Sequence, residues 1–97
     1  MPSLTGTLVT DQGSWTVYVI QTESGKLYTG ITVDLERRMS EHRVGSRGAK
    51  FFRTSRPKRV VYEERHADRS GALRREREIK GMSRTEKLEL IRVRIPK

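Results

Sequence analysis

Four side chains that together could act on a phosphate ester follow one another along a short part of the sequence. Tyr18 and Tyr28 stand ten residues apart, in two segments that favour β-strands. Arg38 and His42 lie just downstream, in a segment that favours a helix. A phenol can exchange a proton, a guanidinium binds phosphate oxygens in a planar fork, and an imidazole changes charge near neutral pH. Gathered on one surface, these groups would suit the hydrolysis of a phosphodiester bond.

The two tyrosines are predicted to share one face of a β-hairpin. Their segments flank the sequence Glu-Ser-Gly at 23–25, which fits a three-residue turn with the glycine in the left-handed conformation. This turn places Tyr18 opposite Gly30 and Tyr28 opposite Ile20, so that the two rings lie diagonally on one face beside a glycine. A two-residue turn would send them to opposite faces. The alternative is that both are ordinary strand tyrosines with buried rings and hydroxyls in water.

The helix predicted over 33–44 carries polar side chains on a face that is otherwise apolar. At about 100° per residue, one narrow stripe contains Leu35, Arg38, Met39 and His42. Arg37 and Glu41 are predicted to point elsewhere. Because an unpaired buried guanidinium is costly, Arg38 needs either an acidic partner or a place at the margin of a cleft that an anion can reach. The alternative is an arginine that extends to solvent beside a hydrogen-bonded core histidine.

The helix predicted over 71–80 carries a carboxylate in the middle of its packing stripe. On the helical wheel, Glu76 is bracketed by Ala72, Leu73, Ile79 and Lys80, whereas Glu78 faces the opposite side. A carboxylate in this position is disfavoured unless a positive group meets it, and a metal ion is one such group. Glu76 is therefore the candidate metal ligand. The alternative is an ion pair with one of the many nearby arginines.

The charge of the chain favours a nucleic acid as its partner. The 97 residues include 21 Lys+Arg and 12 Asp+Glu, a formal net charge of +9 that attracts polyanions through counterion release. Residues 45–59 read as a loop held by Phe51 and Phe52. The cations of this loop are the predicted phosphate contacts, namely Arg47, Lys50, Arg53, Arg56, Lys58 and Arg59. A solubilising surface loop would show a similar composition.

The composition also bounds the setting of the protein. There are no cysteines, which excludes disulfides, thiolate nucleophiles and zinc ribbons and is compatible with a reducing cytosol. No apolar run approaches the roughly 20 residues that span a bilayer, and no secretory signal opens the chain. We therefore expect a cytoplasmic protein with no membrane association, and no obligate protein partner is evident.

The predicted fold class is α/β, of the α+β kind: a small central three-stranded sheet, hairpin first, flanked by helices. A single domain is expected over 14–93, between a loose N-terminal arm at 1–13 and a basic tail at 94–97. The expected elements are strands at 15–20, 26–31 and 60–63, and helices at 33–44, 71–80 and 84–91. Their expected N-caps are Thr32, Asp68 or Ser70, and Ser83. In the last helix, Leu88 and Ile91 are the expected core contacts.

With these residues in this order, the chain resembles the GIY-YIG nuclease family, and more closely its small single-domain bacterial members. In that family two tripeptides lie on adjacent strands, an arginine follows the second tyrosine by ten residues, a histidine or tyrosine comes one helical turn later, and a glutamate lies on a later helix. The matching positions are Tyr18, Tyr28, Arg38, His42 and Glu76, and the resemblance covers residues 15 to about 91. Val17, Val19 and Thr29 depart from the family tripeptides, and the chain has no asparagine, although several family nucleases carry a supporting one.

The resemblance implies hydrolysis of DNA with one Mg²⁺ or Mn²⁺ ion, leaving a 5′ phosphate and a 3′ hydroxyl. Arg38 would clamp the phosphate, Glu76 would hold the metal, and His42 would assist a tyrosine base that stays open between Tyr18 and Tyr28. Gly30 would be structural. Single-stranded, branched or damaged DNA, in repair or recombination, is the expected substrate, and RNA stays open. The alternative is a non-catalytic nucleic-acid-binding module that kept the fold after losing activity.

Overall fold

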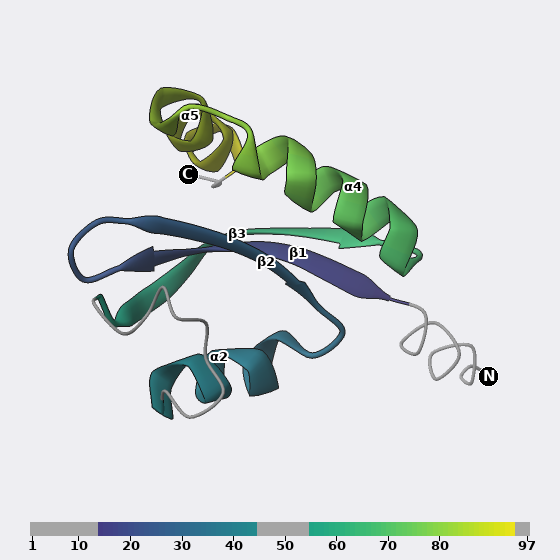
Figure 1. Cartoon of the computed structure of the whole chain (residues 1–97), viewed down its shortest axis with the longest axis horizontal. Coiled ribbons are helices and arrows are strands. Elements are labelled where there is room, and N and C mark those ends of the chain that lie inside the picture. The colour runs from purple at the N-terminus through teal and green to yellow at the C-terminus, as the bar shows by residue number, and fades with distance from the viewer. Residues whose placement is uncertain (1–13, 45–54, 95–97) are drawn as a thin grey trace.

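The structure, a computed structural model, places a three-stranded antiparallel sheet between helices (Figure 1) and describes residues 14–44 and 55–94. The elements along the chain are β1 (Trp15–Thr22), β2 (Leu27–Thr32), α2 (Leu35–Val44), β3 (Pro57–His66), α4 (Arg69–Lys80) and α5 (Arg84–Arg94). The strand order is β2-β1-β3, so β1 is central and β2 is an edge strand. The helix α2 covers one face of the sheet, whereas α4 and α5 lie over the other. The predicted fold class is confirmed.

The hairpin has the predicted register. Tyr18 pairs with Gly30 and Ile20 pairs with Tyr28. The turn that sets this register has Gly25 at φ +91°, and the amide of Thr22 donates a hydrogen bond of 2.9 Å to the carbonyl of Lys26. Both tyrosines therefore lie on the face that α2 covers.

Two separate clusters of buried side chains pack on the two faces. On the α4 and α5 side, the cluster contains Val17, Val19, Tyr62, Ala72, Ile79 and Ile91. On the α2 side, it contains Tyr18, Ile20 and Met39, with Tyr28, Leu35 and Val60 packed against them. The alternation of side chains along β1 divides its residues between the two clusters.

The helix α2 begins two residues later than predicted, and its cap is a different residue. The side chain of Asp34 accepts a hydrogen bond of 3.1 Å from the amide of Arg37, and the first helical bond runs from the Arg38 amide to the Asp34 carbonyl. The hydroxyl of Thr32, the predicted cap, accepts instead from the Asp34 amide. Asp34 is the cap because its carboxylate reaches the third amide of the helix, where its negative charge also complements the helix dipole.

The C-terminal helices are longer than predicted. Asp68 caps α4 by accepting from the amide of Gly71 at 2.8 Å, so this helix begins at Arg69. A capping box joins Ser83 and Glu86 at the start of α5. That helix runs to Arg94 and so includes the first residue of the predicted tail.

Two further expectations about packing and length are corrected. Leu88 is 42% exposed and is not a core contact, because α5 packs against the core through Leu90 and Ile91 instead. The third strand spans Pro57–His66 rather than 60–63, since the long central strand β1 gives it a pairing partner along its whole length.

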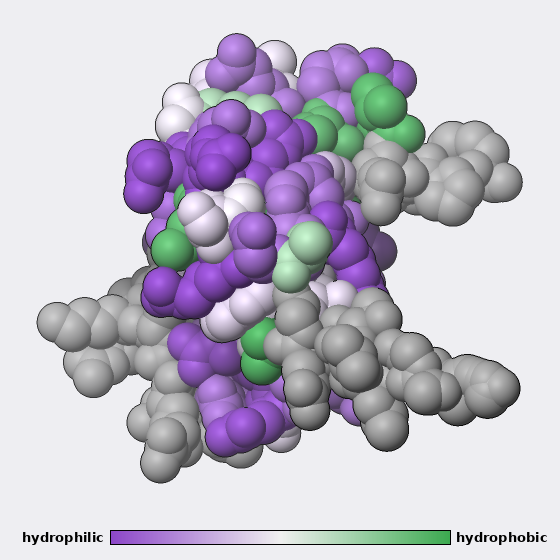
Figure 2. Space-filling model, turned by 90° about the vertical axis from the view of Figure 1, so that its right-hand side faces the viewer, coloured by the Kyte–Doolittle hydropathy of each residue, from purple (hydrophilic) through white to green (hydrophobic). Residues whose placement is uncertain are grey.

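The surface is mostly hydrophilic, with isolated hydrophobic residues, on the side shown in Figure 2. In the described parts of the chain, no helix has both the length and the apolar composition needed to cross a membrane. The predicted N-terminal arm, the Phe51-Phe52 pair and most of the basic loop lie outside the described residues.

Candidate active site

Three of the rings predicted to form the site meet on the α2 face of the sheet. The hydroxyl oxygen of Tyr18 lies 3.1 Å from Nε2 of His42, and each of these two residues is only 1% exposed. The ring centroid of Tyr28 lies 6.3 Å from that of Tyr18 and 5.5 Å from that of His42, whose plane it meets edge-on. Tyr28 is half-buried, so it is the phenol nearer to solvent.

Gly30 allows Tyr18 to occupy this place. A Cβ added at Gly30 would lie 2.6 Å from the hydroxyl oxygen of Tyr18 and 2.8 Å from the ring carbon that bears it. Both distances are shorter than van der Waals contact, and the buried ring, held by His42, has little room to move. A glycine is therefore required opposite Tyr18 if the phenol is to reach the imidazole.

Arg38 lies beside the rings with an acidic partner. Its Nη1 donates a hydrogen bond of 2.8 Å to Oε1 of Glu41, and both side chains are partly buried. Glu41 was expected to point away from the stripe, but its long side chain turns back toward the arginine one turn earlier. It also pairs with the exposed Arg37 at 3.4 Å. Arg38 and Glu41 are three residues apart, a spacing at which opposite charges on a helix lie within reach of each other. This sequence signal could have identified Glu41 as the acidic partner.

The buried pair of Tyr18 and His42 is neutral at physiological pH. Burial, followed by the neighbouring Tyr28, raises the pKa of Tyr18 to about 12, although Arg38 acts in the opposite direction. Burial, followed by the positive charge of Arg38, lowers the pKa of His42 to about 4. Either tautomer of the neutral imidazole can complete this bond: a proton on Nδ1 leaves Nε2 to accept from the Tyr18 hydroxyl, whereas a proton on Nε2 is donated to the Tyr18 oxygen.

Glu76 comes from a different helix than Arg38 and His42. It belongs to α4, which packs on the opposite face of the sheet, and its side chain is 18% exposed. Oε2 of Glu76 is 3.3 Å from Nζ of Lys80, so its partner is the lysine one turn later rather than an arginine. After burial and Tyr28, Glu76 is among the groups that raise the pKa of Tyr18. Its charge therefore acts on the phenol even though the two belong to different faces.

The donor set fits a magnesium ion that is held mainly by water and substrate. Among residues 14–44 and 55–94, no three His, Cys, Asp or Glu side chains gather into a group that could hold a metal. Mg²⁺ commonly binds proteins through one or two carboxylates, and waters and phosphate oxygens complete its shell. The partly buried Glu76, whose present partner is an exposed lysine, can supply one such ligand.

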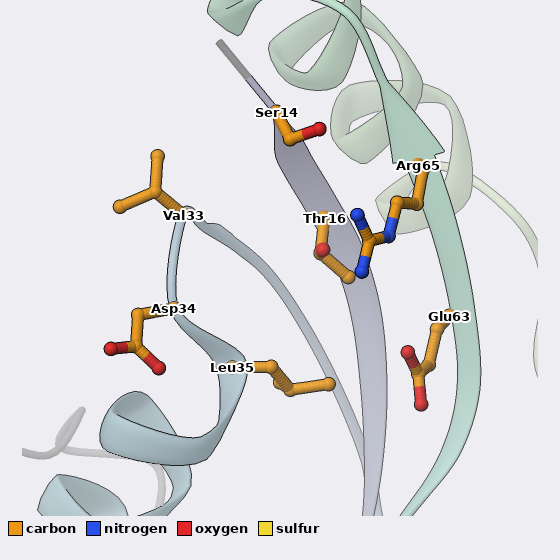
Figure 3. Close-up of a pocket in the computed structure, with 7 residues that line it drawn as sticks. All are labelled: Ser14, Thr16, Val33, Asp34, Leu35, Glu63 and Arg65. Atoms are coloured by element: carbon orange, nitrogen blue, oxygen red, sulfur yellow. The ribbon is translucent and has the colours of Figure 1, made fainter. Parts of the chain in front are cut away.

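A pocket adjoins the start of α2 on the same face of the sheet (Figure 3). It has a volume of about 340 Å³ and is lined by Ser14, Thr16, Val33, Asp34, Leu35, Glu63 and Arg65. A smaller hollow of about 130 Å³ shares Val33 and Asp34 with it and extends to Arg38. The hollowed surface of this face therefore reaches the guanidinium.

Only part of the predicted nucleic-acid surface can be located. Arg56, Lys58 and Arg59 are exposed at the start of β3, as a phosphate contact requires. The carbonyl of Arg56 accepts a hydrogen bond of 2.9 Å from the amide of Glu23, which ties this segment to the hairpin turn. The other three predicted contacts, Arg47, Lys50 and Arg53, lie outside the described residues.

The comparisons with known proteins agree with this arrangement. The GIY-YIG catalytic domain family matches residues 14–89. A UPF0213 protein of Desulfotalea psychrophila is 45% identical over 83 residues, which cover 86% of this chain and 76% of that protein. One of Syntrophus aciditrophicus is 46% identical over 76 residues, covering 78% and 87%. The solution NMR structure of a UPF0213 protein from Bacillus halodurans matches with a TM-score of 0.54 at 34% identity, covering 82% of this chain and 84% of that one.

The fold is thus that of a small nuclease-type domain. The chain belongs to the GIY-YIG family. The names of its relatives state no activity, substrate or metal, and a shared fold does not determine the chemistry of a site.

Proposed function

We propose that this protein is a metal-dependent endonuclease that hydrolyses phosphodiester bonds in DNA. The observation that supports this most is the hydrogen bond between Tyr18 and His42, buried beside Tyr28 on the face that also holds Arg38. A histidine and two phenols with a guanidinium at their margin combine a route for a proton with a binding group for a phosphate.

Arg38 is proposed to bind the scissile phosphate. In the reaction a water attacks the phosphorus, the bond to the 3′ oxygen breaks, and negative charge accumulates on the remaining phosphate oxygens. Glu41 accepts a hydrogen bond of 2.8 Å from Nη1 and so holds the guanidinium in place, and the planar fork of an arginine matches two phosphate oxygens. Arg38 thereby stabilises the charge where it develops.

The Tyr18–His42 pair is proposed to relay the proton of the attacking water. Moving the proton fully from a phenol of pKa about 12 to an imidazole of pKa about 4 would cost roughly 11 kcal/mol, at about 1.4 kcal/mol for each pKa unit. In a concerted relay, with His42 in the tautomer protonated on Nδ1, the Tyr18 oxygen would accept a proton from the attacking water while its own proton passes to Nε2 of His42. No tyrosinate forms, and the positive charge of the resulting imidazolium would be balanced by the negative charge of the phosphate. Tyr28, nearer to solvent, would orient the water.

Glu76 is proposed to hold one Mg²⁺ or Mn²⁺ ion. The ion, when bound, supplies positive charge that stabilises the phosphate and the leaving 3′ oxygen. For this, the side chain of Lys80, which is exposed, has to release Oε2 of Glu76. Ion pairs at i,i+4 on helices contribute only about 0.3–0.5 kcal/mol. The pair is therefore a weak competitor for the carboxylate.

The proposal is tested by two matched substitutions on α4. Glu76→Gln should lower the rate of Mg²⁺-dependent cleavage of a labelled DNA by about 100-fold or more, because the metal ligand is lost. Glu78→Gln removes the same charge from an exposed side chain that pairs with Arg75, and should cleave as the wild type does. DNA affinity should be unchanged in both. Equal cleavage by the two variants would remove Glu76 from the mechanism.

A non-catalytic nucleic-acid-binding module is the second candidate. Its support is that Arg38 and Glu76 both have ion-pair partners and that Tyr18 and His42 are almost inaccessible. Incubation of a labelled strand with Mg²⁺ or with a chelator separates the two functions. Cleavage only with Mg²⁺ supports the nuclease, whereas binding without cleavage under either condition supports the module.

The substrate is proposed to be single-stranded, branched or damaged DNA, handled in the cytoplasm during repair or recombination. A small domain has little surface for reading base sequence, so it should prefer the shape of its substrate. Cleavage rates on matched single-stranded, duplex and branched oligonucleotides, in DNA and in RNA, test this preference.

A further inference from the structure

A group of cationic side chains lines a hollow on the side of the sheet away from the tyrosines. A hollow of about 260 Å³ is lined by Lys26, Leu27, Arg84 and Lys87. Lys26 directly follows the hairpin turn, and Arg84 and Lys87 stand one turn apart at the start of α5. Three of the four lining residues are cations, and Leu27 supplies the apolar part.

The cations come together because α5 begins beside the hairpin. Nη2 of Arg84 lies 4.0 Å from the position that a Cβ would take at Gly25, so the guanidinium reaches the turn itself. Figure 1 shows α5, the hairpin turn and the start of β3 at the same end of the sheet. The hollow is thus built by two segments far apart in the sequence, and no local sequence pattern indicates it.

Among the residues that the structure describes, no carboxylate lines this hollow. Glu86 is engaged in the capping box, where it accepts a hydrogen bond of 2.8 Å from the amide of Ser83. Glu89 pairs with Arg92 at 2.8 Å. Within the described ranges, neither Arg84 nor Lys87 forms an ion pair, and Glu23 of the turn is not among the lining residues. Within these ranges, the positive charges of Arg84 and Lys87 are therefore not compensated by an ion pair, and an anion can bind them.

The hollow and the tyrosines lie on the two sides of the same edge strand. Successive side chains of β2 point to opposite faces, so Leu27 lies on the α5 side and Tyr28 on the α2 side. Because β2 is at the edge of the sheet, a chain passing over this edge can contact both sides. The carbonyl of Arg56 accepts a hydrogen bond from the amide of Glu23 in the turn, so the start of β3 lies at the same end of the sheet.

We propose that the hollow between Lys26, Arg84 and Lys87 binds a phosphate of the nucleic-acid strand outside the site of cleavage. The inference rests on the proposed function, because it assumes that the strand crosses the edge of β2. Two lysines and an arginine suit a phosphodiester, because its oxygens accept hydrogen bonds both from ammonium groups and from the planar fork of a guanidinium. A contact of this kind holds the strand regardless of its base sequence.

The test measures binding with no cleavage. A labelled single-stranded DNA is titrated in EDTA at several salt concentrations, with wild-type protein and with the double variant Arg84→Gln, Lys87→Gln. We expect several-fold weaker binding, and a slope of log affinity against log salt that is smaller by about 1 to 1.5. The matched control Arg74→Gln, Arg77→Gln removes the same charge from two exposed positions on α4, and thermal melting confirms that both variants fold.

The outcomes separate this inference from the nuclease proposal. An equal loss of affinity in the two double variants would overturn the phosphate site, even if the protein cleaves DNA. A selective loss supports the site, even if no cleavage is ever found. Wild-type protein that binds no DNA would overturn both proposals. Vesicles of anionic phospholipid give the last comparison: a selective effect on vesicle binding, with none on DNA, would assign the hollow to a membrane headgroup and overturn the inference.

Discussion

The two faces of the sheet differ in what they bury. The face under α4 and α5 is an ordinary apolar core, in which Val17, Val19 and Ile79 pack together with almost no exposed surface. The face under α2 buries a phenol and an imidazole, Tyr18 and His42, that are hydrogen-bonded to each other. The comparison indicates that the face under α4 and α5 contributes most of the stability. The face under α2 instead buries polar groups that can take part in a reaction.

The central strand serves both faces at once. Val17 and Val19 alternate with Tyr18, so one strand contributes aliphatic packing on one side and the candidate reactive hydroxyl on the other. A substitution on either side should therefore affect the two properties differently. Each of the following predictions tests that division.

The largest expected effect is on the apolar face. Ile79→Ala should lower the free energy of unfolding by about 4 kcal/mol, because Ile79 is fully buried between α4 and the sheet and leaves a cavity. Urea denaturation measures this, with Leu88→Ala on the exposed surface of α5 as a control that should cost less than about 1 kcal/mol. Similar losses for the two variants would contradict the proposed role of the α4 face.

The next effect belongs to the polar face and depends on pH. Because the pKa of His42 is about 4 in the folded protein and near 6.5 in the unfolded chain, the unfolded chain takes up the proton first as the pH falls. Stability is therefore lost between about pH 6.5 and pH 4, by at most about 3 kcal/mol. Above pH 6.5 this contribution is complete and constant.

The variant His42→Gln isolates the contribution of this histidine. Its side chain does not titrate, so its free energy of unfolding should fall less than that of the wild type over the same pH interval. Urea denaturation at several pH values measures the difference between the two proteins. If the two pH dependences run parallel, His42 is not held neutral by its surroundings.

The third prediction concerns the glycine opposite Tyr18. Gly30→Ala should lower the free energy of unfolding by about 2 kcal/mol, since the added Cβ would overlap the phenol at 2.6 Å. It should also reduce DNA cleavage, because the ring has to leave His42. Gly81→Ala is the matched control: its Cβ would meet nothing closer than 3.5 Å, and its backbone is in the right-handed helical region. A harmless Gly30→Ala would show that the ring is free to shift.

The sequence predicted the elements that depend on local patterns. The register of the hairpin followed from the turn at 23–25, because the number of residues in the turn fixes which side chains share a face. The capping residues of α4 and α5 likewise follow from hydrogen bonds within a few residues. The predicted stripe of α2 is also correct for Arg38 and His42, which both lie on the face of the helix that meets Tyr18.

Contacts between distant segments were beyond such patterns. Helical periodicity gave the facing of Glu76 along its own helix, but not that α4 covers the face opposite the tyrosines. The hollow at Arg84 required α5 to begin beside the hairpin turn, a tertiary arrangement with no local signature. Side chains with several rotatable bonds were also missed: Glu41 turns back to Arg38 although the wheel places it elsewhere.

The smallest expected effect concerns a buried hydroxyl on the apolar face that has no hydrogen-bond partner among the described residues. Thr29, on β2, departs from the isoleucine typical of the family and is almost fully buried. Within residues 14–44 and 55–94, its hydroxyl has no hydrogen-bond partner. Thr29→Val should therefore raise the free energy of unfolding by about 1 kcal/mol, since it replaces an unsatisfied hydroxyl with a methyl of similar size.

The same substitution at Thr22 should have the opposite sign. Thr22 is as deeply buried on the neighbouring strand, but its hydroxyl accepts a hydrogen bond of 3.0 Å from the amide of Lys26 in the hairpin turn. Thr22→Val leaves that amide without its partner and should cost about 1 kcal/mol. Thermal or urea denaturation of the two variants compares them directly. Opposite signs would show that the hydrogen bond decides the value of a buried hydroxyl in this sheet, whereas two stabilised variants would mean that apolar burial alone decides it.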